Sequence, residues 1–448
     1  MDVEVKSSDA AEPADPWVDV PAVPLTLAET GIPEAFLREL VLKTIWAHDM
    51  PTLGGIANIT GLHARVVEEL VTGLNREGLC DIDQGSAAGG VQFRYRLSDR
   101  GKNAAHDALG RSRYVGKAPV PVSMYNQVIA EQVRRYKRPP LADVKQALAH
   151  MVLTERLVEV IGQAFFSRRA LMIFGPSGNG KTDMVTSIAN IVAGTIVIPY
   201  ALYGHGQLIR VFDPEVHKSL VDEKEAPSDN LFGDRAFKHD QRWLPVHRPS
   251  VIVGGDMGAE ALEMSYDATQ GVHQAPLSVV AQGGVLVIDD LGRQKVSPKE
   301  ILNRWVLMME QGFDSFALST SEIIRLPLDV TLVFSTNLTL HDLMDEAYLR
   351  RIAYKIAIPD PSREQLAEIT RRYCRSRGIE WKEEAIQYLV DRLFAGDKAP
   401  HGCFPRDIIT TVIDEAEFTG RDPVLDRESI DTACTLYLGI GDVLDDAA

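Results

Sequence analysis

The sequence predicts an α/β fold built on a parallel sheet, and three observations support this prediction. Residues 175–182 are Gly-Pro-Ser-Gly-Asn-Gly-Lys-Thr, a complete phosphate-loop motif of the form G-x-x-x-x-G-K-[ST]. An apolar run ends at Phe174 and an amphipathic stretch begins at Asp183, so a strand precedes the motif and a helix follows it. A second apolar run, 285–288, is too continuous for a half-exposed strand and suits a parallel strand covered on both faces.

The phosphate-loop motif predicts nucleotide binding. Its glycines allow the backbone to curl so that successive N–H groups face phosphate oxygens, and the following helix adds its positive N-terminal end. Lys181 is expected at the β and γ phosphates, and Thr182 at Mg²⁺. The alternative is a glycine-rich turn without a ligand. The residues expected to bind ATP are Gly175, Pro176, Ser177, Gly178, Asn179, Gly180, Lys181, Thr182 and Asp183.

Two carboxylates follow the apolar run at 285–288 and support a metal-dependent reaction. Asp289 stands at the end of the predicted strand, where it is expected to bind Mg²⁺ together with Thr182. Asp290 is expected to orient the attacking water. The alternative is a strand that ends in two solvated acids.

The next part of the chain resembles the AAA+ ATPases. The apolar strand at 330–336 ends in Asn337, where that superfamily carries its first sensor residue. The segment 345–359, with Arg350 and Arg351, is similar to the arginine-finger segment and the fifth core strand. Residues 404–409, with Arg406, are similar to the second sensor helix of the lid. These elements occur in the superfamily's order over about 150–440.

The resemblance implies a parallel sheet of order 5-1-4-3-2, with 195–198 as its second strand, and a C-terminal helical lid. Asn337 would help to place the water, and Arg406 would sense the nucleotide from the lid. Arg350 or Arg351 would act on the nucleotide of a neighbouring subunit, since a guanidinium can stabilise the developing phosphate charge. The alternatives are cations that neutralise a helix end for the Arg pair, and a solvated helix start for Arg406.

Asp290 departs from the superfamily's common pattern, because remodelling AAA+ proteins usually carry Glu at this position. The Asp289-Asp290 pair and the following Leu291-Gly292 are similar to the helicase-loader branch. Residues 345–352 and the long lid are more similar to the chaperone-like MoxR type. The branch stays open, and slow hydrolysis is expected because the shorter carboxylate reaches water less well.

Composition predicts an ordinary globular chain of two or three domains, since its 448 residues are 45% apolar and 25% charged. An apolar run long enough to cross a membrane and a secretory signal are both missing from the sequence, so a cytoplasmic protein without membrane insertion is expected. Its four cysteines are far apart and its histidines scattered, which indicates neither a disulfide framework nor a zinc cluster. The net charge of −16 argues against broad attachment to nucleic acid.

Residues 31–110 predict a separate module of three helices, a hairpin and a fourth helix. This order resembles a winged helix-turn-helix domain. The third helix offers Arg65, Asn75 and Arg76 to a DNA groove, but it also carries three glutamates. Protein docking or oligomer assembly is therefore the favoured use of the module, and nucleic-acid binding stays open.

The predicted organisation has six parts: a disordered acidic tail at 1–30, the winged-helix-like module at 31–110, a linker and leading helix at 111–150, the ATPase core at 151–360, the lid at 361–440 and an acidic tail at 441–448. Two functions remain. One is a homo-oligomeric ring or spiral, expected to be a hexamer, that remodels an unknown protein client. The other is a nucleic-acid-associated loader or regulator. A P-loop kinase is less favoured, because it would not need Asn337 or the paired Arg350 and Arg351.

Overall fold

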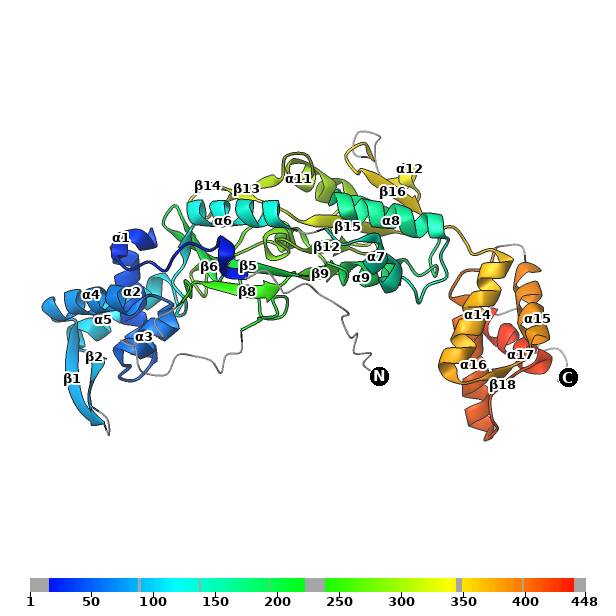
Figure 1. Cartoon of the computed structure of the whole chain (residues 1–448), viewed down its shortest axis with the longest axis horizontal. Coiled ribbons are helices and arrows are strands. Elements are labelled where there is room, and N and C mark those ends of the chain that lie inside the picture. The colour runs from blue at the N-terminus through cyan, green and yellow to red at the C-terminus, as the bar shows by residue number, and fades with distance from the viewer. Residues whose placement is uncertain are drawn as a thin grey trace.

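The chain forms an α/β core with a helical part at each end, as the computed structural model shows (Figure 1). The N-terminal module, coloured blue to cyan, lies at one end, and the C-terminal helices, coloured orange to red, lie at the other. The structure describes residues 16–87, 90–136, 138–192, 194–221, 238–343, 349–396 and 399–438. The predicted tail at 441–448 and residues 1–15 of the predicted N-terminal tail lie outside these ranges.

The core contains a parallel five-stranded sheet in the order β16-β4-β15-β12-β9. In chain order this is the predicted 5-1-4-3-2, so the fold class is confirmed. The strands are β4 (Leu171–Phe174), β9 (Ser250–Val253), β12 (Val285–Ile288), β15 (Thr331–Thr336) and β16 (Tyr354–Ala357).

The second strand of this sheet is a correction to the prediction. The expected segment 195–198 lies in β5 (Thr195–Pro199), which pairs antiparallel with β8 (Trp243–His247) in a separate two-stranded sheet. The strand that bonds to β12 is β9, with Val285 opposite Ser250. Both segments are short apolar runs, and periodicity alone does not say which of two such runs pairs with a given neighbour.

Both faces of the core sheet are buried, as the continuous apolar strands predicted. Alternate residues of β12 point to opposite sides: Val285 and Val287 pack in one hydrophobic cluster, and Leu286 and Ile288 in another. The helices that contribute to these clusters are α6 (Val122–Arg135), α7 (Leu141–Ala147), α8 (Glu155–Ser167), α9 (Lys181–Ala189), α10 (Leu277–Val280), α11 (Pro298–Gln311) and α12 (Leu340–Leu343).

A second sheet extends the core on the side of the N-terminal module, in the order β10-β11-β7-β6-β3. Its strands are β3 (Val120–Pro121), β6 (Ala201–Gly204), β7 (Gln207–Arg210), β10 (Ser265–Asp267) and β11 (Val272–Gln274). A hairpin of β13 (Phe313–Ala317) and β14 (Ile323–Pro327) precedes β15, and a short 3₁₀ turn spans Ala259–Ala261.

Part of the predicted linker belongs to the core, which is a second correction. Strand β3 and helix α6 lie within 111–150, and Tyr125, Val128 and Ile129 of α6 are buried in the core cluster. The apolar face was missed in the sequence because the basic residues near 134–138 directly follow the buried turns of α6 and are typical of a solvated segment.

The N-terminal module consists of α2 (Glu34–Ala47), α3 (Leu53–Thr60), α4 (Ala64–Arg76), a hairpin of β1 (Cys80–Ala87) and β2 (Gly90–Leu97), and α5 (Asp99–Arg111). It has a hydrophobic cluster of its own. It also contacts the second sheet, since the rings of Phe36 and Tyr203 lie 5.0 Å apart. Tyr203 therefore packs at an internal interface.

Residues 16–30 are folded, contrary to the disordered tail expected over 1–30. A 3₁₀ helix (Pro16–Asp19) and α1 (Leu27–Thr30) form there. The Trp17 ring stacks on His239 at 4.6 Å, and Asp19 pairs with Arg135 at 3.0 Å. Contacts of this kind with distant residues order a segment whose average composition favours disorder.

The C-terminal part contains α14 (Arg363–Arg377), α15 (Glu383–Phe394), α16 (Phe404–Thr419) and α17 (Arg427–Leu438). Two short strands, β17 (Glu380–Trp381) and β18 (Val424–Leu425), pair beside them. These helices share a hydrophobic cluster separate from that of the core. The part is therefore packed as a unit that meets the core along a limited surface.

Candidate functional site

The phosphate-loop motif connects β4 to α9, as its flanking residues predict. Gly175, Gly178 and Gly180 all have positive φ, at 146°, 82° and 76°. A Cβ atom on Gly175 would come within 2.2 Å of the Ile358 carbonyl oxygen. The loop therefore curls tightly against the residue that follows β16, and a side chain at Gly175 would displace the loop.

Lys181 is buried in the first turn of α9 and bends back over the loop. Its Nζ donates to the carbonyl oxygens of Gly175 at 2.9 Å and Pro176 at 2.6 Å. Burial lowers the pKa of the Lys181 ammonium, against the opposing charges of Asp290 and Asp289. The ammonium thus lies beside the loop whose N–H groups are predicted to face phosphate.

The predicted carboxylates meet neutral partners at the carboxyl ends of the core strands. Asp289, directly after β12, accepts a hydrogen bond from the Thr182 hydroxyl at 2.7 Å. Asp290 accepts one from the Asn337 side chain at 2.8 Å, and Asn337 directly follows β15. Residues predicted from three separate segments therefore converge, because parallel strands end at one edge of the sheet.

The segment after β12 is held by backbone and side-chain hydrogen bonds. Asp290 has a φ of 52°, in the left-handed region that non-glycine residues rarely occupy. Leu291 N donates to the Ser335 carbonyl at 2.7 Å, and Gln294 Nε2 donates to the Asp289 carbonyl at 2.8 Å. These bonds fix a strained turn that points Asp290 toward Asn337.

A cavity of about 1010 Å³ lies between the phosphate loop and the C-terminal helices. It is lined by Ser177 to Asp183 and by Asp290 and Asn337. From the C-terminal helices, Arg372, Tyr373, Cys403 and Arg406 line the opposite side. The core therefore forms most of the cavity, and the helical part completes it.

Arg406 lines this cavity, as the sensor prediction requires. Its Nε donates to Asp407 at 2.7 Å, and this hydrogen bond is the largest influence that raises the pKa of the Arg406 guanidinium. Arg350 and Arg351 are outside the residues that line the cavity within the described part of the chain. Arg351 Nε donates to Glu310 of α11 at 2.6 Å. The two arginines are therefore not brought to the cavity of their own chain.

The oxygen atoms of Thr182, which lines the cavity, and of its partner Asp289 fit a magnesium ion. Thr182 and Asp289 offer a hydroxyl and a carboxylate within 2.7 Å of each other. Mg²⁺ bound with a nucleotide typically takes one or two protein oxygens, phosphate oxygens and water. Among the described residues, His, Cys, Asp and Glu side chains form no cluster of three or more suited to a metal ion. One hydroxyl and one carboxylate are thus a donor set that suits a nucleotide-bound cation.

Several residues that line the cavity were not predicted. His150 lies 3.1 Å from Asp183, and Arg372 of α14 donates to the Ala149 and Met151 carbonyls at 2.9 and 3.1 Å. No local pattern connects α14 with the segment before α8, because the two are separated by more than 200 residues. The only sequence feature that marks Arg372 is the pair of consecutive arginines in α14, and such pairs are typical of solvated helices.

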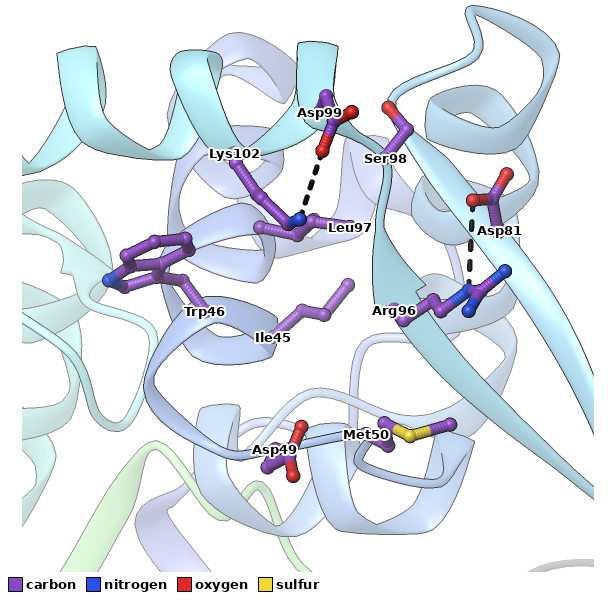
Figure 2. Close-up of a pocket in the computed structure, with 10 residues that line it drawn as sticks. All are labelled: Ile45, Trp46, Asp49, Met50, Asp81, Arg96, Leu97, Ser98, Asp99 and Lys102. Carbon is purple, nitrogen blue, oxygen red and sulfur yellow. Dashed lines mark hydrogen bonds and ion pairs between the residues drawn. The ribbon is translucent and has the colours of Figure 1, made fainter.

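A second cavity, of about 640 Å³, lies in the N-terminal module (Figure 2). The end of α2, the base of the β-hairpin and the start of α5 surround it. Lys102 pairs with Asp99 at 3.0 Å, and Arg96 lies 3.8 Å from Asp81 on the neighbouring strand. The exposed Trp46 ring stands at its rim. Its basic groups are thus paired with carboxylates of the same cavity.

Comparison with known proteins gives a partial match in the C-terminal helices. Residues 362–436 match a family described as a domain of unknown function (DUF8689). No curated protein matches the chain. Similar solved structures include the RuvB Holliday junction branch migration motor of Thermotoga maritima, which is 13% identical with a TM-score of 0.38, over 63% of this chain and 69% of that one. NtrX from Brucella abortus in complex with ADP is 15% identical with a TM-score of 0.37, over 73% of this chain and 64% of that one.

Among the described residues, none of the helices combines the length and the apolar character needed to cross a bilayer.

Proposed function

We propose that this chain is an AAA+ protein that binds ATP with Mg²⁺, hydrolyses it and uses the turnover to remodel a protein client. One observation carries the proposal. The phosphate loop, the Thr182–Asp289 pair and the Asp290–Asn337 pair meet at one edge of a 5-1-4-3-2 sheet, beside a cavity that the C-terminal helices complete. This arrangement supports in-line transfer of the γ-phosphoryl group to water.

Each residue at this edge has a role that follows from its chemistry. The backbone N–H groups of the loop and the Lys181 ammonium stabilise phosphate charge. Thr182 and Asp289 would hold Mg²⁺, which neutralises charge on the phosphates when it is bound. Asp290 and Asn337 orient water, since a carboxylate accepts its proton and an amide fixes the carboxylate's direction. The short Asp290 side chain is expected to give slow turnover.

Assembly into a ring or spiral is the natural extension of this site. Arg350 and Arg351 lie after the sensor strand β15 but outside the cavity of their own chain. A guanidinium supplied by a neighbouring subunit would complete the positive charge around the γ-phosphate. We infer a homo-oligomer, in a cytoplasmic setting, in which each cavity lies at a subunit interface and Arg406 closes it from the lid.

The N-terminal module favours a protein partner over nucleic acid. It has the helix order of a winged helix, but α4 offers few free groups to a DNA groove. Asn75 is engaged with the Cys80 carbonyl at 2.6 Å, and the exposed Glu68 and Glu69 would repel phosphates. The exposed Arg65 and Arg76 of α4 and the basic hairpin residues Arg94 and Arg96 are the remaining argument for the alternative, a nucleic-acid-associated loader or regulator.

The test is the size of the protein by light scattering, with its ATPase rate in parallel, for wild type and Asp290→Asn. Both are measured with ATP and Mg²⁺, in the presence and absence of duplex DNA. We expect Asp290→Asn to reduce turnover about a hundredfold and to retain an ATP-dependent assembly that is insensitive to DNA.

Other outcomes separate the alternatives. Faster turnover or assembly driven by DNA, with a steep salt dependence, would select the nucleic-acid function. Turnover without ATP-dependent assembly would contradict the assigned role of Arg350 and Arg351. Absence of ATP hydrolysis in the wild type would contradict the proposed activity itself.

A further inference from the structure

Asn179, in the phosphate loop, uses its side chain to bind the C-terminal part of the molecule. Its Nδ2 donates to Asp360 Oδ1 at 2.9 Å and to the Pro359 carbonyl at 3.2 Å. Its Oδ1 accepts from the Gly402 backbone N–H at 2.8 Å. Pro359 and Asp360 connect β16 to α14, and Gly402 lies just before α16. One side chain therefore binds two segments at the junction of the helical part and the core.

The chemistry of these contacts fixes the direction of the amide. Both atoms that receive hydrogen bonds from Nδ2 are oxygens without protons, and the atom that donates to Oδ1 is a backbone nitrogen. A rotated amide would place NH₂ against the Gly402 N–H and oxygen against a carboxylate. His401 adds a further contact, because its Nδ1 lies 2.9 Å from the same Asp360 oxygen.

Gly178, next to Asn179, allows the start of α16 to lie close to the loop. A Cβ atom on Gly178 would come within 2.6 Å of the Cys403 sulfur, so the glycine allows this approach. The residue after Cys403 begins α16, and Arg406 projects from its first turn into the cavity. The Asn179–Gly402 bond thus fixes the helix start that carries Arg406.

We infer that Asn179 is a positioning residue that couples the phosphate loop to the lid and sets the place of Arg406 over the nucleotide. This inference rests on the proposed function. The backbone of Asn179 belongs to the loop that cradles phosphate, and its side chain holds Asp360 and Gly402. A shift of the loop backbone on nucleotide binding is therefore transmitted to the start of α16 without an intermediate element.

The first test is steady-state ATP hydrolysis by Asn179→Ala, Arg406→Ala and the double variant. Asn179→Ala is expected to lower kcat about tenfold with less than about a threefold change in KM, because the backbone phosphate contacts remain. In the Arg406→Ala background the same change should cost less than about twofold, since the two residues act through one step. Full additivity would overturn the coupling.

Conservative and matched variants separate positioning from general damage. Asp360→Asn keeps an oxygen that can accept from Asn179 and is expected to stay within about twofold of wild type, whereas Asp360→Ala should resemble Asn179→Ala. Asn190→Ala changes an exposed asparagine at the other end of α9 and should leave activity unchanged. Equal effects of the two asparagine variants would contradict the inference.

Hydrogen exchange of the full-length protein tests the hydrogen bond between Asn179 and Gly402 without relying on ATP hydrolysis. The Gly402 amide should exchange at least about tenfold faster in Asn179→Ala and remain protected in Arg406→Ala. If the wild type does not hydrolyse ATP, the proposed function fails, but exchange at Gly402 still tests whether Asn179 holds the start of α16. Unchanged exchange at Gly402 in Asn179→Ala would show that the hydrogen bond does not hold the lid.

Discussion

The carboxylates at the two cavities of this chain have different hydrogen-bond and ion-pair partners. At the phosphate loop, Asp289 and Asp290 accept hydrogen bonds from neutral donors, a hydroxyl and an amide, at 2.7 and 2.8 Å. In the N-terminal module, Asp99 and Asp81 face the cations of Lys102 and Arg96 (Figure 2). Asp290 also accepts from the exposed Arg293 at 3.4 Å, which is closer than Arg96 lies to Asp81, so the contrast is clearest between Asp289 and Asp99.

This difference indicates which cavity is prepared for a charged ligand. A carboxylate oriented by a neutral group keeps its negative charge for a metal ion or a proton. A carboxylate paired with an ammonium or guanidinium forms a pair without net charge. Exposed pairs of this kind contribute little to stability. We therefore expect substitutions at the two cavities to have very different consequences, although the residue types are the same.

The largest effect is expected for Lys181→Ala. Removing a buried ammonium from the phosphate loop should lower kcat/KM for ATP by at least about a hundredfold and weaken binding of a fluorescent ATP analogue. The matched control is Lys102→Ala, which removes an ammonium from the second cavity and should leave both measurements unchanged. Equal losses in the two variants would remove the distinction between the cavities.

A smaller effect is expected for Asp289→Asn. The amide keeps the hydrogen bond from Thr182 but loses the charge that would hold Mg²⁺, so the Mg²⁺ concentration for half-maximal ATPase rate should rise about tenfold or more. A titration of rate against Mg²⁺ measures this shift. Asp99→Asn, at the second cavity, should follow the wild-type curve, and an unshifted curve for Asp289→Asn would exclude this carboxylate as the metal ligand.

The sequence was most informative where function depends on short, contiguous patterns. The phosphate loop and Asp289-Asp290 each occupy a few adjacent residues, and the buried strands that carry them are continuous apolar runs. The sheet order followed from resemblance, and the order was confirmed. Which apolar run is the second strand was predicted wrongly, because β5 and β9 are alike in composition and only their partners differ.

What could not be predicted depends on contacts between distant segments. The side-chain partners of Asn179 lie about 180 and 223 residues away in the chain, so no local pattern marks the residue as a link to the lid. The motif identifies Asn179 only through its backbone. Folding of residues 16–30 is another case, since Trp17 finds its ring partner in His239.

The smallest predicted effect concerns the stability of the N-terminal module. Lys43 is 2% exposed, and its Nζ donates to the Ser112 carbonyl at 3.0 Å. Burial lowers the pKa of the Lys43 ammonium to about 8, so between that pH and the usual value of 10.5 the unfolded chain binds more protons than the folded chain. Below pH 8 the charge is present in both states, and its burial costs stability. As pH rises through this window, the cost is relieved.

Lys43→Met should therefore stabilise the module at pH 7 by about 1 to 2 kcal/mol, after the lost hydrogen bond to Ser112 is subtracted. The advantage over wild type should shrink toward pH 10, because the wild-type lysine is then neutral when folded. Thermal unfolding of the module at pH 7 and at pH 9.5 measures the difference, with Lys102→Met as the exposed control. If the advantage of Lys43→Met instead grows with pH, the buried ammonium stabilises the module through its contact with Ser112, and the prediction is wrong.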